Sequence, residues 1–136
     1  NLINRAEKLF RTSVTFDGGS GSGAVGSVTV ATVIGSILFK HLTVRCTTSL
    51  SGASATVAFG VTGNTAALIA ATTATDIDIN DYWQDTSPEL NISDAMVDKV
   101  LNQNLLITVA TAAVSAGVLE VSGLWVPMSA DGNITT

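Results

Sequence analysis

The chain has 136 residues, which is the size of one domain with a buried core. Only 12% of the residues are charged and the net charge is −5, so the sequence lacks the clustered Lys and Arg side chains that binding to nucleic acid requires. A chain so poor in charge either lies in a membrane or buries much of its surface against other chains.

The first dozen residues show a helical periodicity. Their apolar residues fall on one helical face, which predicts a helical or extended arm over residues 1–16. A helix of this length is not stable alone in water, so we expect the arm to lie against a partner. Basic residues border the apolar face, which suits a groove with an acidic rim. The candidate interface residues are Leu2, Ile3, Arg5, Lys8, Leu9, Phe10 and Arg11.

Residues 17–27 are rich in Gly and Ser and predict a flexible loop between the arm and the body. Three of the glycines, Gly21, Gly23 and Gly26, match the GxGxxG spacing of dinucleotide-binding loops. That spacing binds a pyrophosphate only where the last Gly opens a helix, and here Gly26 opens a β-branched run. We therefore expect a plain loop and no cofactor.

Apolar and polar residues alternate through most of the remaining chain, which predicts β-strands. Within residues 37–46 the alternation slips by one position near Lys40 and His41, and such a slip predicts a β-bulge. Residues 57–61 and 66–75 are predicted as further strands, although the Ala content of the second also fits a helix. Closely spaced short strands are typical of antiparallel sandwiches. We expect an all-β, jelly-roll-like β-sandwich over residues 28–136.

The segment 93–102 is ambiguous. Ser93 could cap a short helix across one end of the sandwich, and a strand fits this segment almost as well.

Residues 105–127 carry a single charge, Glu120, and raise the question of a membrane span. The uncharged stretch before Glu120 is shorter than the roughly 20 residues that a spanning helix needs. Apolar residues alternate with a period of two on both sides of a break at residues 115–117. We therefore predict a β-hairpin, ended by Pro127, and no contact with a membrane.

Four carboxylates within residues 76–85 invite comparison with a calcium-binding loop. An EF-hand loop would place Gly at its sixth position and Glu at its twelfth, where this chain has Asp81 and Ser87. The alternation of Asp with Ile fits the solvent-facing side of a strand better. We expect no metal at this segment.

The remaining candidates for chemistry are few. His41 is expected to be structural or exposed, and no GxSxG motif accompanies it, so we do not expect an enzyme. Cys46 lies on the apolar parity and is expected to be a small core residue. The aromatic residues Tyr82, Trp83 and Trp125 either fill the core or form a sugar-stacking platform. With only seven aromatic residues in the chain, we expect them in the core.

Three phrases carry a resemblance to a known class of proteins. They are FDGGSGSGAVGSVTV at residues 16–30, GVTGNTAALIAATTATDIDIN at residues 60–80 and LWVPMSADGN at residues 124–133. They resemble the small, Ala/Thr/Gly-rich cement or decoration proteins of tailed-bacteriophage capsids. The resemblance implies a β-sandwich on the outer capsid surface of the virion. It further implies a dimer or trimer that braces neighbouring capsomers, with the major capsid protein and copies of itself as partners.

Charge is spread unevenly along the chain. Residues 1–50 hold five basic and two acidic residues, a net of +3, whereas residues 51–136 hold one basic and nine acidic residues, a net of −8. This asymmetry suggests two faces with different neighbours. The alternative is a phage tail or fibre module that recognises host glycan through Tyr82, Trp83 or Trp125. Aromatic side chains exposed in a groove would favour the glycan-binding module, and buried ones the decoration protein.

Overall fold

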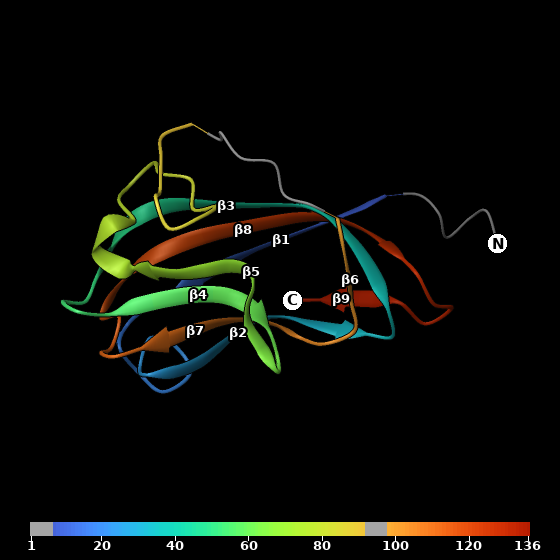
Figure 1. The fold of residues 1–136 in the computed structure, drawn as a ribbon, viewed down its shortest axis with the longest axis horizontal. Helices are drawn as coiled ribbons and strands as arrows, with labels where there is room; N and C mark the ends of the chain where they lie inside the picture. Colours follow the sequence, from blue (N-terminus) through green and yellow to red (C-terminus); the bar gives the residue numbers. More distant parts are fainter. Residues whose placement is uncertain (1–6, 92–97) are drawn as a thin grey trace.

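The chain folds into two antiparallel β-sheets that enclose one apolar core (Figure 1). The computed structural model describes residues 7–91 and 98–136. The four-stranded sheet has the order β1 (Lys8–Thr15), β8 (Ala116–Pro127), β3 (Ile37–Ser51), β6 (Lys99–Leu101). The five-stranded sheet has the order β5 (Asn64–Thr73), β4 (Thr56–Val61), β7 (Leu105–Ala110), β2 (Gly26–Ile34), β9 (Asn133–Thr135). The predicted all-β class is confirmed.

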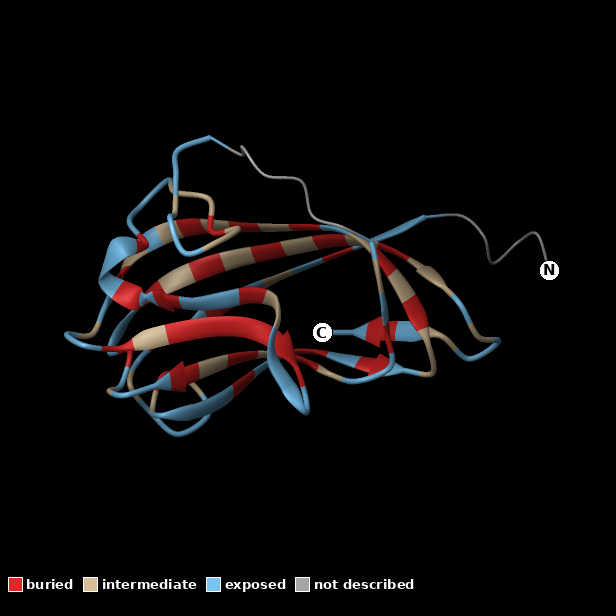
Figure 2. Ribbon diagram, in the orientation of Figure 1, coloured by how far each residue is buried: buried red, intermediate tan, exposed pale blue. Residues whose placement is uncertain are grey.

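The core follows from the period-two pattern of the central strands. Along β8 the buried residues include Leu119, Val121 and Trp125, and Figure 2 shows them alternating with half-buried positions. The five-stranded sheet contributes Ile107 and Val109 from β7, both of which are almost fully buried. Each such side chain stabilises the fold by roughly 1.5–3 kcal/mol relative to an exposed position.

The predicted β-bulge in β3 is confirmed. Phe39 pairs with Trp125 and His41 pairs with Leu124, so Lys40 is the extra residue on the bulged strand. The insertion moves the buried positions of β3 from one parity to the other, and Phe39 and Leu42 both point into the core.

The N-terminal segment is extended, which is one of the two predicted forms, but it belongs to the sandwich and is not a separate arm. Lys8–Thr15 forms β1, a strand at the edge of the four-stranded sheet, and a helix is wrong for these residues. β1 pairs with β8 without interruption from Lys8↔Trp125 to Thr15↔Val118. Eight residues of backbone pairing, with alternate side chains in the core, outweigh a helical face that a dozen residues cannot sustain alone. Leu2, Ile3 and Arg5 lie outside the described residues.

The predicted hairpin at residues 105–127 is also wrong in its pairing. Both strands exist, as β7 and β8, but they belong to different sheets. The connection between them crosses the sandwich, with Thr111 at φ 74° and Val114 fully buried. β8 lies between β1 and β3, and β7 lies between β4 and β2, so each strand already has two partners. No helix among the described residues is long and apolar enough to cross a membrane.

Three further segments differ in how well they match the structure predicted for them. The predicted strand at residues 66–75 is confirmed as β5, which leads into a 3-10 turn, η2 (Ala74–Asp76). The predicted strand around residues 77–83 is instead an irregular segment along the edge of β3, where the N–H of Trp83 donates to the carbonyl of Val44 (2.9 Å). Asn80, at φ 74°, interrupts its regular extension. Of the ambiguous segment 93–102, residues 93–97 are not described, and Lys99–Leu101 forms the short strand β6.

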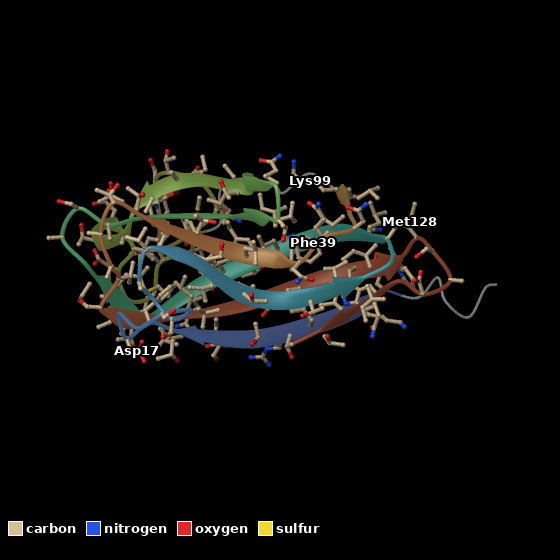
Figure 3. The ribbon with its side chains drawn as sticks, turned by 90° about the horizontal axis from the view of Figure 1, so that it is seen from below. Asp17, Phe39, Lys99 and Met128 are labelled. Carbon is tan, nitrogen blue, oxygen red and sulfur yellow. The ribbon has the colours of Figure 1, made fainter. Side chains whose placement is uncertain are left out.

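Local hydrogen bonds and a close backbone contact shape the Gly/Ser loop. Asp17 accepts hydrogen bonds from the N–H of Gly19 (2.8 Å) and the hydroxyl of Ser22 (2.5 Å). These bonds, that of Ser22 first, lower the pKa of the Asp17 carboxyl. A Cβ at Gly23 would lie 2.2 Å from the carbonyl oxygen of Val114, so Gly is required where the loop meets the β7–β8 connection. Figure 3 shows Asp17 and Met128 at opposite ends of the sandwich.

Candidate interaction surfaces

The structure divides the predicted interface residues of β1 between two environments. Phe10 points into the core, where its ring lies 5.8 Å from that of Phe39. Leu9 points outward and is 60% exposed. Lys8 lies at the rim of the core, with its ammonium 5.3 Å from the centre of the Trp125 ring. Phe10 is therefore a core residue, and only its neighbours remain available to a partner.

A group of apolar side chains lies on the outer face of the four-stranded sheet. Leu9 pairs with Leu124, and Leu38 pairs with both Val126 and Val100. Paired side chains on one face of a sheet have Cβ atoms about 4.5–5.5 Å apart, so these residues form one surface across all four strands. Leu9 and Val100 are 60% and 61% exposed, and the other three are half-buried. We call these five residues the outer apolar patch.

The sequence analysis did not predict this patch. In β3 and β8 the period of two identifies the residues that face the core, and it predicts polar residues at the positions between them. At one end of the sheet the outward-facing residues Leu38, Leu124 and Val126 are apolar instead. Apolar residues on both parities of a strand are the signal that identifies such a surface.

Charge is distributed unequally between the two sheets. The strands of the five-stranded sheet contain no charged residue, as their sequences show. The strands of the four-stranded sheet contain five basic residues and one acidic residue, Glu120, for a net of +4. The basic residues are Lys8, Arg11, Lys40, Arg45 and Lys99. The two outer faces of the sandwich are therefore suited to different neighbours.

Two ion pairs hold cations near the patch. Arg11 Nη2 lies 3.2 Å from Glu120 Oε1, beside a shallow depression of about 220 Å³ between β1 and β8. Lys40 Nζ lies 2.9 Å from Glu7 Oε1, and the hydrogen bond and charge of Glu7 raise the pKa of the Lys40 ammonium. Both pairs are open to solvent, which screens their charges, so neither contributes much to stability.

The connection from η2 to the loop after Trp83 is negatively charged, whereas the strands of the four-stranded sheet carry a net positive charge. Residues 74–91 contain five carboxylates and no Lys or Arg, for a net of −5. Two large apolar side chains are exposed among these carboxylates, Ile79 at 54% and Leu90 at 66%. We call residues 74–91 the acidic segment. It pairs with the half of β3 that lies away from the outer apolar patch.

Two of the four carboxylates in the segment compared with a calcium-binding loop accept local hydrogen bonds. Asp81 Oδ2 accepts from the N–H of Asp78 (3.1 Å), and Asp85 Oδ1 accepts from the N–H of Ser87 (2.7 Å). Within residues 7–91 and 98–136 no group of three or more His, Cys, Asp or Glu side chains is arranged to hold a metal ion.

The two tryptophans considered for sugar stacking are core residues, as predicted. Trp83 is fully buried, and its Nε1–H donates to Thr72 Oγ1 at 2.8 Å. Trp125 is 3% exposed. Tyr82 is half-buried, and its backbone pairs with that of Glu89. The feature on which the glycan-binding alternative rested is therefore absent for both tryptophans.

The other single residues lie where the sequence placed them. His41 is exposed, with Nε2 3.0 Å from the hydroxyl of Thr43. Cys46 is fully buried, and burial raises the pKa of its thiol to about 11. Gly26 opens the strand β2, so the GxGxxG spacing does not precede a helix.

Comparison of the chain with protein-family models, with curated proteins and with solved structures gave no match.

Proposed function

We propose that this chain is a structural virion protein that decorates the outer surface of a tailed-phage capsid. In this role a jelly-roll-like sandwich contacts the major capsid protein and its own copies, and so braces neighbouring capsomers. It acts by binding protein surfaces, without a cofactor, a nucleic acid or a membrane.

The observation that carries the proposal is the outer apolar patch. It spans all four strands of one sheet, and Leu9 and Val100 leave well over half of their surface exposed. Contiguous apolar surface bordered by charge is typical of a protein-binding site. The uncharged five-stranded sheet adds a second face of different character, which suits a protein that bridges two neighbours.

Many weak contacts would suffice for this role. A decorated capsid presents the same site repeatedly, and an oligomer that occupies several sites gains effective affinity without new contacts. Buried Trp83 and Trp125 also support the proposal, because a glycan-binding module would need aromatic side chains open to solvent.

Co-sedimentation tests the proposal. Purified chain is mixed with capsids of the virus that encodes it, stripped of outer proteins, and the capsids are pelleted. We expect saturable binding at a fixed ratio to the capsid protein. A chain that stays in the supernatant at every concentration would contradict the proposal, and unrelated icosahedral capsids serve as the control.

A further inference from the structure

Two surfaces of this chain complement one another. The outer apolar patch lies on a sheet whose strands carry a net of +4, and the net is +2 when Glu7 and Asp98 at the strand ends are included. One of these cations, Arg45, lies beside the acidic segment, where its Nη2 donates to Asn80 Oδ1 (3.0 Å), so the net charge beside the patch is +1. The acidic segment carries a net of −5 around exposed Ile79 and Leu90. Apolar side chains surrounded by opposite charges form the pattern of complementary protein surfaces.

The two surfaces cannot meet within one molecule. The acidic segment pairs with residues 44–50 of β3, and the patch includes Leu38 near the start of the same strand. At about 3.3 Å per residue, roughly 20–40 Å of β3 separates the two surfaces. Figure 1 shows the yellow-green acidic segment above one end of β3 and β6 at the other end.

We propose that two copies of this chain associate face to face about a two-fold axis, each covering the outer apolar patch of the other with its acidic segment. A two-fold axis perpendicular to β3 exchanges the ends of the strand. It therefore places the acidic segment of each copy over the patch of its partner. Ile79 and Leu90 of one copy then lie among Leu9, Leu38 and Val100 of the other.

The two-fold arrangement forms both contacts at once. Such an interface is isologous, because each surface of one copy meets the other surface of the second copy. Direct stacking of patch on patch would instead bring the cations of both copies together, at an electrostatic cost. This inference rests on the self-association in the proposed function and names its interface, but it is tested on the purified chain without a capsid.

Sedimentation equilibrium of the parent chain is the first measurement. We expect a dimer whose dissociation constant rises at least tenfold between about 0.05 and 0.5 M salt, because screening weakens the attraction between the two surfaces. A parent chain that is monomeric at about 0.1 mM, or that forms a species other than a dimer, would overturn the proposal.

Two double variants test the two surfaces separately. Leu9→Asp with Val100→Asp alters the patch, and Ile79→Lys with Leu90→Lys alters the acidic segment. All four side chains are at least 54% exposed, so the fold should persist, as circular dichroism will check. Each variant should raise the dissociation constant at least about tenfold.

Matched controls place the same charges elsewhere. Val25 and Ile34 are 62% and 47% exposed and lie outside both surfaces. Their replacement by Asp, and separately by Lys, should leave the dissociation constant within about threefold of the parent. Patch and segment variants that dimerise as well as these controls would overturn the proposal.

An equimolar mixture of the patch variant and the segment variant provides the sharpest test. In the mixed dimer one contact has the parent residues on both sides, and in the other the new Asp residues face the new Lys residues. The mixture should therefore form heterodimers that neither variant forms with itself. A mixture that remains monomeric would contradict the two-fold arrangement.

Discussion

The hydrogen bond between Trp83 and Thr72 gives a prediction with a defined magnitude. Thr72 is 2% exposed, and its hydroxyl accepts from Trp83 Nε1–H at 2.8 Å and donates to the carbonyl of Ala70 at 2.9 Å. Thr72→Val keeps the shape of the side chain but removes both bonds, together with a longer one from the hydroxyl to the carbonyl of Asp85 (3.3 Å). It leaves a buried indole N–H without this acceptor, which costs about 1–3 kcal/mol. Loss of the second bond adds about 0.5–1.5 kcal/mol.

A double-mutant cycle separates the hydrogen bond from other effects of the substitution. Trp83→Phe removes the donor and leaves space beside Phe59, whose ring centre lies 6.2 Å from that of Trp83. In the Trp83→Phe background, Thr72→Val should cost about 1–2 kcal/mol less, because no indole N–H is left behind.

Urea unfolding followed by far-ultraviolet circular dichroism measures these free energies, since it does not depend on tryptophan fluorescence. Thr29→Val on the exposed side of β2 is the matched control and should change stability by less than about 0.5 kcal/mol. The reasoning is refuted if Thr72→Val behaves like this control, or if the two core substitutions are additive.

Three other predictions concern the core. Phe10→Ala should lower the unfolding free energy in urea by about 3–5 kcal/mol, and a loss below about 1 kcal/mol would mean that β1 is not part of the core. Gly123→Ala places a Cβ 2.5 Å from ring atoms of Phe10 and Phe39 and should cost about 1–3 kcal/mol in the same assay. The thiol of Cys46 has its pKa raised from 9.0 to about 11, so the unfolded state ionises first and stability should fall as pH rises from 9.0 to about 11. Cys46→Ala should reduce that pH dependence. An unchanged slope of the unfolding free energy against pH would show that the Cys46 thiol is not its cause.

The strands were predictable wherever one parity was apolar and the other polar. The slip near Lys40 revealed the bulge because a bulge changes the parity of buried residues locally. The pairing of β7 and β8 was not predictable, because their alternation is the same whether they pair with each other or lie in opposite sheets. That choice depends on distant residues, such as those of β1 and β2.

The N-terminal strand shows a second limit. Leu9 and Phe10 are adjacent and both apolar, which fits one side of a helix as well as two sides of a strand. In the structure Phe10 enters the core, and Leu9 joins Leu124 on the outer face. An apolar residue on the outer face removes the alternation of apolar and polar residues by which a strand is recognised. Leu9, which belongs to the outer apolar patch, is therefore one reason why β1 was not predicted as a strand.

Quantitative mass spectrometry of purified virions tests the proposed role most directly. If the chain decorates the capsid, its copy number should be a fixed, near-stoichiometric fraction of that of the major capsid protein, and it should be accessible to protease on intact particles. Virions that lack the chain, or carry only a few copies of it, would contradict the account.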